Sequence, residues 1–275
     1  MDNKRLIKRI GFMQGRLSKV YDNQIQSFPK KNWIKELTTC KKIGLKRIEW
    51  TLNYPDLFEN PLLKNKKKTI KILNKKKIKM NSITCDFFMQ KPFFKKENSH
   101  YVHDFIKVLK IFSKEKFILV LPLVDNGSIR SKIEENIIIK KFFKIYEKIL
   151  KNKKLIICFE SDYPPKKLRH FIKKFNKKSF GINYDTGNSA SLGYECEDEF
   201  QNYGERILNI HIKDRKYHGK TVRLGEGDCN FKKIFNSLSK IKYNKNLILQ
   251  TARNYKSKHL FELNTNLSFI KNQIQ

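Results

Sequence analysis

Short apolar segments alternate along the chain with longer segments in which apolar residues recur every three or four positions. The first kind predicts buried strands, and the second predicts amphipathic helices that cover them. Eight such strand–helix units follow one another within the 275 residues. The predicted strands span residues 7–13, 46–51, 80–85, 117–121, 155–159, 181–184, 207–210 and 247–249.

The predicted helices follow these strands in turn, and a glycine such as Gly44 marks where one of them stops. Strands that alternate with helices form parallel βαβ units, and eight units in a chain of this length predict a single (β/α)8 TIM barrel. We expect residues 1–275 to form this one domain. An open doubly wound sheet is the structural alternative, but it normally carries a Gly-rich first turn. Gly11 and Gly15 do not form GxGxxG. The predicted helices lie near 31–42, 60–76, 98–113, 132–150, 164–175, 197–206, 231–241 and 259–271.

Four consecutive predicted strands, the fifth to the eighth, each stop at one polar residue: Glu160, Asp185, His211 and Gln250. The carboxyl ends of barrel strands meet at the face that carries the chemistry, and neighbouring strands lie only about 4.8 Å apart. Two carboxylates, one imidazole and an amide oxygen predict a site for one divalent metal ion. This set favours Mn²⁺, Mg²⁺ or Co²⁺, and Zn²⁺ is also compatible. Taken singly, Asp185 in DTGN also fits a helix cap, and His211 fits a half-buried core histidine.

The formal net charge of +34 suggests a polyanionic partner when it is taken alone. Lys outnumbers Arg several-fold, however, and the lysines occur on every predicted helix, as expected for solvated faces. A nucleic-acid groove needs clustered Arg with interleaved aromatics, so we do not expect nucleic acid as a partner. A basic rim would still attract phosphorylated or carboxylated small molecules.

The five cysteines are scattered and form no CxxC, which indicates reduced thiols of a cytoplasmic protein. The N-terminus lacks the apolar core of a signal peptide, and no apolar stretch is long enough to cross a bilayer. We therefore expect no membrane partner. The sequence does not distinguish a monomer from a homo-oligomer.

Several motifs resemble the xylose isomerase-like TIM-barrel superfamily, in particular its sugar phosphate isomerase and epimerase branch. They are NYDTGN at strand six, HIKDR at strand seven, LGEGDCNF before strand eight, and GFMQGRLS, GLKRIEW and NSITCDFFM at strands one to three. The resemblance extends over essentially the whole chain. It implies an enzyme of carbohydrate metabolism that acts on a sugar or sugar phosphate.

The resemblance also implies roles for individual residues. Glu160, Asp185 and His211 correspond to three ligands of a divalent metal, and Gln250 stands where the family has a fourth ligand, a Glu. Asn188 stands where the family often has a His that holds the substrate. The implied reaction is proton transfer next to a carbonyl through an enediolate, with Glu160 as the catalytic base.

The replacement of Glu by Gln250 bears on the kind of reaction. An epimerase of this family uses two carboxylates, and an amide is not a base near neutral pH. A loop group such as Asp214, His218 or Glu226 would have to replace it, whereas an aldose–ketose isomerase needs only Glu160. The replacement therefore favours an isomerase, and it leaves open a lyase or a non-catalytic sugar-binding barrel. A DNA-repair endonuclease of the related apurinic-site type needs many more His ligands than this chain offers.

Further polar residues are candidates for binding the substrate. Arg215 follows His211 closely, and its guanidinium can form paired hydrogen bonds to a hydroxyl or a phosphate. Surface charge is the alternative for it and for the other cations. The remaining candidates are two cations, Lys213 and Arg253, and three residues near other strand ends, Gln14, Glu49 and Asp86.

Overall fold

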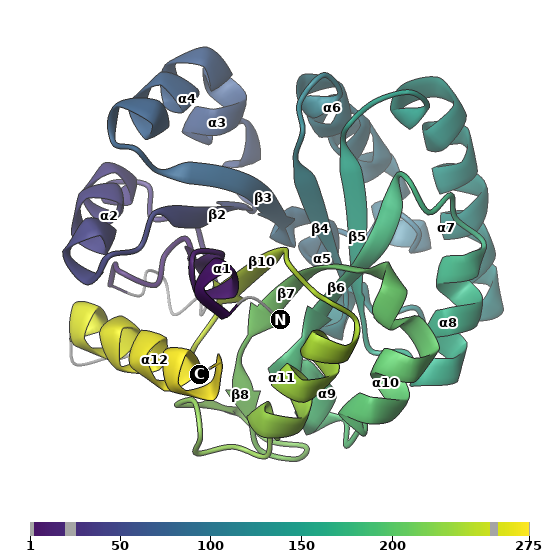
Figure 1. The fold of residues 1–275 in the computed structure, drawn as a ribbon. Helices are drawn as coiled ribbons and strands as arrows, with labels where there is room; N and C mark the ends of the chain where they lie inside the picture. Colours follow the sequence, from purple (N-terminus) through teal and green to yellow (C-terminus); the bar gives the residue numbers. More distant parts are fainter. Residues whose placement is uncertain (1–2, 20–25, 254–257, 275) are drawn as a thin grey trace.

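The computed structural model describes residues 3–19, 26–253 and 258–274. Within them, eight parallel strands close into a barrel in the order β1-β10-β7-β6-β5-β4-β3-β2, and the helices lie around it (Figure 1). This confirms the predicted (β/α)8 TIM barrel. The barrel strands are β1 (Ile10–Met13), β2 (Arg47–Leu52), β3 (Lys79–Cys85), β4 (Ile118–Leu123), β5 (Ile156–Ser161), β6 (Phe180–Asp185), β7 (Ile207–Ile212) and β10 (Asn246–Leu249).

The helices fall close to their predicted places, and short 3-10 turns extend several of them. The π-helical turn Tyr146–Leu150 ends the helix before β5. The α-helices are α1 (Asn3–Ile7), α2 (Trp33–Thr39), α3 (Pro61–Lys64), α4 (Lys66–Lys75), α5 (Asp86–Gln90), α6 (Val102–Phe112), α7 (Lys132–Ile145), α8 (Pro165–Lys173), α9 (Thr186–Ser191), α10 (Cys196–Tyr203), α11 (Phe231–Lys240) and α12 (His259–Ile274). The 3-10 turns are Cys40–Ile43, Leu57–Glu59, Lys96–Tyr101, Asp125–Gly127 and Gly204–Arg206.

Capping residues explain several of these boundaries. Gly44 ends the first predicted helix with a φ of 75°, a conformation that glycine adopts without strain. Asn65 divides the second predicted helix into α3 and α4, and its side chain accepts a hydrogen bond from the Lys68 amide. Asn230 caps α11 in the same way.

Most strand ends lie one or two residues from their predicted positions, and two of the differences have a clear physical reason. The strand expected at 7–13 begins only at Ile10, because Ile7 ends α1 and Leu6 packs into the core. Strand β4 continues past Pro122 to Leu123. Its pairing with β3 ends at Val120, whereas Pro122 and Leu123 pair with β5. Pro122, which has no backbone N–H, therefore lies beyond the part of β4 that forms hydrogen bonds with β3.

The core lies inside the barrel and between the strands and the helix layer. Phe142, Phe159 and Phe180 pack together there with aromatic centroids 5.2–6.1 Å apart. All five cysteines are free, as predicted, and four of them are buried. None of the helices in the described ranges is long and apolar enough to span a bilayer.

The loop predicted between β7 and α11 contains a two-stranded hairpin, β8 (Asp214–Arg215) and β9 (Thr221–Val222). The buried carboxylate of Asp214 fixes the following turn by accepting backbone hydrogen bonds from Gly225, Gly227 and Cys229 at 2.8–3.1 Å. These contacts favour a structural role for Asp214 over the predicted replacement of a catalytic carboxylate.

Candidate metal centre

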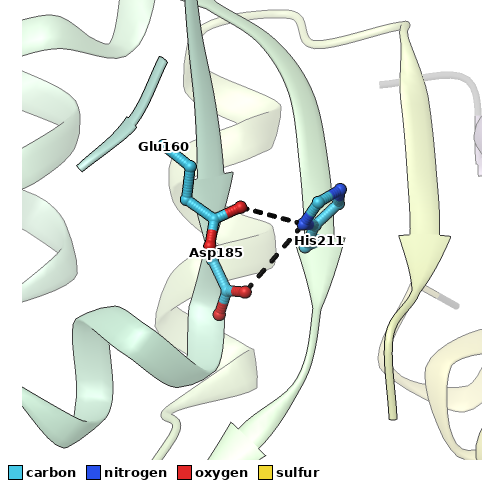
Figure 2. Close-up of side chains that lie close together, drawn as sticks. All are labelled: Glu160, Asp185 and His211. Carbon is cyan, nitrogen blue, oxygen red and sulfur yellow. Dashed lines mark ion pairs between the residues drawn. The ribbon is translucent and has the colours of Figure 1, made fainter. Parts of the chain in front are cut away.

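Three of the predicted ligands meet at the carboxyl ends of β5, β6 and β7. Glu160, Asp185 and His211 each offer one atom, and these atoms all lie within 4.8 Å of one another. The pairing of β6 with β7 places Asp185 directly beside His211. Figure 2 shows both carboxylates turned toward the same ring nitrogen, Nδ1 of His211, at 3.1 Å for Glu160 and 4.0 Å for Asp185. All three side chains are buried.

The two carboxylates are held by different contacts. Glu160 accepts hydrogen bonds from the side-chain amides of Asn183 at 2.7 Å and Asn188 at 2.8 Å. Asp185 caps α9 through Oδ1, which accepts from the Asn188 amide nitrogen at 2.8 Å. Its other oxygen, Oδ2, forms an ion pair with Nζ of Lys213 at 2.8 Å. Asp185 therefore serves as a helix cap with one oxygen and presents the other to the site.

A buried polar layer lies on the other side of His211. Its Nε2 atom donates to Oε1 of Glu49 at 2.6 Å. The side-chain amide of Asn209 donates to Oε2 of Glu49 at 2.9 Å and to the side-chain oxygen of Asn183 at 2.8 Å. A carboxylate that accepts from one ring nitrogen fixes the imidazole so that the other nitrogen faces a metal. Glu49 is fully buried, so its contacts favour a positioning role over the predicted contact with substrate.

Charges at the site shift several ionisation equilibria. Burial lowers the pKa of His211, but Glu49 and Glu160 outweigh it and raise this pKa to about 10. Burial raises the pKa of Glu160, yet the adjacent His211 lowers it below its usual range. Burial also raises the pKa of Asp185, against the opposing effect of Lys213. The residues therefore form a compact ionic cluster in which His211 and Lys213 carry the positive charges.

The donor atoms fit a divalent ion. Nδ1 of His211 and Oδ2 of Asp185 lie against the charged groups of Glu160 and Lys213. Among the described residues, Oε1 of Gln250 is a buried atom without a hydrogen-bond partner. Gln250 follows β10, and its backbone amide donates to Ile212 of β7 at 3.0 Å. Buried polar atoms are normally satisfied, so an orphaned oxygen at the end of the strand next to His211 indicates a missing ligand. Mainly oxygen donors with one nitrogen suit Mn²⁺, Mg²⁺ or Co²⁺, and Zn²⁺ remains compatible.

Besides Lys213 and Glu49, two further predicted substrate-binding residues are joined to this cluster. Arg215 donates from Nη1 to the side-chain oxygen of Asn188 at 3.0 Å, and its other nitrogens donate to the Gly219 carbonyl. Asn188 in turn donates to Glu160. Asn188 thus links the hairpin guanidinium to the predicted catalytic base, and a role in substrate contact stays a prediction for both residues.

The remaining predicted residues follow β1, β3 and β10. Gln14 is fully buried, and its side-chain oxygen accepts from the Thr51 amide at 3.1 Å. Arg253 donates from Nη2 to the Ser18 carbonyl at 2.6 Å. Asp86 is buried at the end of β3 and is only weakly bonded. The structure brings none of these three into the metal cluster.

Three buried polar residues around the site were not predicted. Asn183 and Asn209 stand two positions before Asp185 and His211, so strand alternation turns them into the barrel with the ligands. This two-residue spacing could have predicted that both asparagines point into the barrel. Arg16 lies in the loop after β1, is buried, and donates to the Thr251 carbonyl at 2.9 Å. No pattern in the sequence distinguishes Arg16 from the many surface cations.

Comparison with known proteins places this geometry in a family. The model of the xylose isomerase-like TIM barrel family matches residues 37–272. The chain belongs to the xylose isomerase-like TIM barrel family. Among sequence relatives, the chain is 30% identical over 82 residues to the uncharacterized protein MJ1311 of Methanocaldococcus jannaschii. That match covers 29% of this chain and 28% of the relative.

Solved structures share the fold of this family member at low sequence identity. The IOLI protein with a bound zinc atom has a TM-score of 0.73 at 14% identity, covering 97% of this chain and 99% of the other. The D-psicose 3-epimerase with D-tagatose from Clostridium cellulolyticum H10 has a TM-score of 0.72 at 12% identity, with the same coverage. These likenesses establish the barrel architecture for this chain.

Proposed function

We propose that this protein is a divalent-metal-dependent isomerase or epimerase of a sugar or sugar phosphate, which works by proton transfer next to a carbonyl group. The observation that carries the proposal is the buried cluster of Glu160, Asp185 and His211 at three neighbouring strand ends. Family membership and the sugar epimerases among proteins of similar fold support the same class of reaction.

In this proposal, Asp185 and His211 hold the ion together with Glu160 and Gln250. The ion supplies positive charge that stabilises the negative charge developing on a substrate oxygen. Glu160 takes the proton from the carbon next to the carbonyl. The neighbouring His211 outweighs the effect of burial and lowers the pKa of Glu160. Glu160 is therefore an ionised carboxylate at neutral pH and can accept the proton. The two asparagine bonds to Glu160 hold the base in one orientation.

Charge at the rim bears on the class of substrate. Lys213 lies within the cluster, and Arg215 contacts Asn188 next to it, so either cation is placed to attract a hydroxyl-rich or phosphorylated molecule. Arg253, three residues after Gln250, adds a third positive group. We expect a small sugar or sugar phosphate as the partner, and neither a membrane nor a nucleic acid.

One observation favours a second candidate, a sugar-binding barrel that works without a metal. The ammonium group of Lys213 lies 2.8 Å from Oδ2 of Asp185, an atom that a metal would otherwise use. In that case Lys213 would neutralise the cluster permanently, and Gln250 would bind sugar through its amide.

Turnover after metal removal separates these candidates. Protein treated with EDTA should convert no ketose or ketose phosphate in a panel that includes D-tagatose, and added Mn²⁺ should restore conversion. Glu160→Gln should abolish activity, since proton transfer by a positioned group contributes about 10²–10⁴-fold in rate. Full activity in EDTA, or full activity of Glu160→Gln, contradicts the proposal.

A further inference from the structure

We propose that Asp86 is a second acid–base group of the site, which exchanges a proton with the substrate from the side of the barrel mouth opposite His211. This inference rests on the proposed function. It assigns to Asp86 the part that Gln250 cannot play, because an amide neither gives up nor takes a proton near neutral pH.

The ring of strands places Asp86 across the mouth from the metal cluster. Asp86 directly follows β3, and the barrel order puts β3 four strands away from β7 in either direction. His211 belongs to β7 and Glu160 to β5. A substrate that contacts an ion at His211 therefore has Glu160 on one flank and Asp86 on the far side of the mouth.

The contacts of Asp86 do not explain it as a structural residue. It is only 5% exposed, and within the described part of the chain its carboxylate accepts one hydrogen bond, a long one of 3.3 Å from the Thr84 hydroxyl to Oδ1. Among the described residues, Oδ2 has no hydrogen-bond partner. Although Asp86 is the first residue of α5, no side chain caps that helix. Burying an unsatisfied carboxyl group costs free energy, so the fold alone gives no reason for this residue.

The surroundings leave this carboxyl group able to exist in both protonation states. Burial, and then the charge of Glu160, raise the pKa of Asp86 to about 7, while His211, Thr84 and Arg16 oppose this shift. A group whose pKa lies near the working pH is often in the protonation state that the reaction needs, and it also transfers its proton readily.

The proposed step conserves protons and electrons. The C–H bond next to the carbonyl breaks as Glu160 takes the proton, and its electron pair forms the enediolate. The enediolate then takes a proton from the neutral Asp86 carboxylic acid and forms a new C–H bond from the other side. Glu160 ends protonated and Asp86 ionised, and exchange with water restores both. Proton delivery from a second group permits inversion of the carbon.

Deuterium exchange in ²H₂O tests this role. The wild-type protein with Mn²⁺ is incubated with D-tagatose and other ketoses and ketose phosphates, and label and conversion are followed by NMR. In Asp86→Asn we expect conversion to fall by about 100-fold or more while Glu160 still labels the substrate carbon. Asp86→Glu should restore part of the conversion. Asp104→Asn, a matched change at a partly buried aspartate that bonds Tyr54, should behave as wild type.

Two results overturn the inference. In the first, Asp86→Asn lowers both the deuterium labelling and the conversion of the sugar, and in the second it lowers neither. A second measurement does not depend on finding the sugar. In ¹³C-carboxyl NMR of aspartate-labelled protein, the signal missing from Asp86→Asn should titrate near pH 7, and a midpoint below pH 5 overturns the inference. If the wild-type protein neither labels nor converts any sugar, the proposed function fails, and the titration still decides the state of Asp86.

Discussion

Glu49 gives the sharpest prediction about how the barrel interior supports metal binding. Its two carboxylate oxygens accept from Nε2 of His211 at 2.6 Å and from the side-chain amide of Asn209 at 2.9 Å. Glu49→Gln keeps the size of the side chain but leaves one acceptor oxygen and adds an N–H donor. Either Nε2 of His211 or the side-chain amide of Asn209 must then face the N–H donor of Gln. The imidazole also loses the carboxylate that orients it.

The expected loss of metal affinity in Glu49→Gln follows from these contacts. The variant keeps all atoms that would touch the ion, so binding should weaken without disappearing. Loss of such an orienting contact typically lowers metal affinity by about 10–100-fold, which is roughly 1.4–2.8 kcal/mol of binding free energy. The effect should appear in the dissociation constant for Mn²⁺, whether or not a sugar is present.

The assay is calorimetric titration of Mn²⁺ into EDTA-treated protein. Glu199→Gln is a matched control, because Glu199 is equally buried but accepts from Tyr184, Ser189 and Tyr203 and contacts none of the three ligands. Circular dichroism checks that each variant is folded. If folded Glu49→Gln binds Mn²⁺ as tightly as wild type, Glu49 does not position His211 and the reasoning is wrong.

Two further predictions concern stability near the site. Burial raises the pKa of Glu199 to about 7, so its stabilising contribution is present below the unfolded pKa of 4.5 and is lost as the pH rises through 7. Urea unfolding at pH 5 and pH 8 should show Glu199→Gln gaining up to about 3 kcal/mol relative to wild type at the higher pH, and an unchanged difference refutes this. A Cβ atom on Gly187 would lie 2.8 Å from Cγ of Lys213, so Gly187→Ala should displace Lys213 from Asp185 and cost about 1–3 kcal/mol of unfolding free energy. That cost should shrink in a Lys213→Ala background, and an equal cost in both backgrounds means that Lys213 is not the obstacle.

The barrel and the meeting of Glu160, Asp185 and His211 were predictable because both leave strong local signals. Buried parallel strands are continuous apolar runs, and a run that stops at one polar residue indicates the catalytic edge. Boundaries were less predictable where the tertiary structure decides them. The Lys-rich start around Ile7 fits a helix as well as a strand, and Pro122 stays in β4 only because the pairing with β3 has already ended.

The buried polar layer beside His211 was harder to predict from the sequence. Glu49 was predicted to line the pocket, but its contact with His211 joins residues 162 positions apart, and no local pattern encodes such a pair. Asn183 and Asn209 share the inward face of their strands with the ligands, so their placement was predictable in principle. The placement of Asp86 across the barrel mouth from His211 depends on the closure of the whole ring, which joins distant parts of the chain.

Metal stoichiometry tests the central claim most directly. Elemental analysis of the purified protein after incubation with Mn²⁺ and removal of free ion should find close to one ion per chain. His211→Ala should lose it, because Nδ1 of His211 is the single nitrogen donor among the three clustered residues. His170→Ala, a matched change at an exposed histidine on α8, should retain it. No bound ion in the wild-type protein, or equal metal in His211→Ala, would contradict the account.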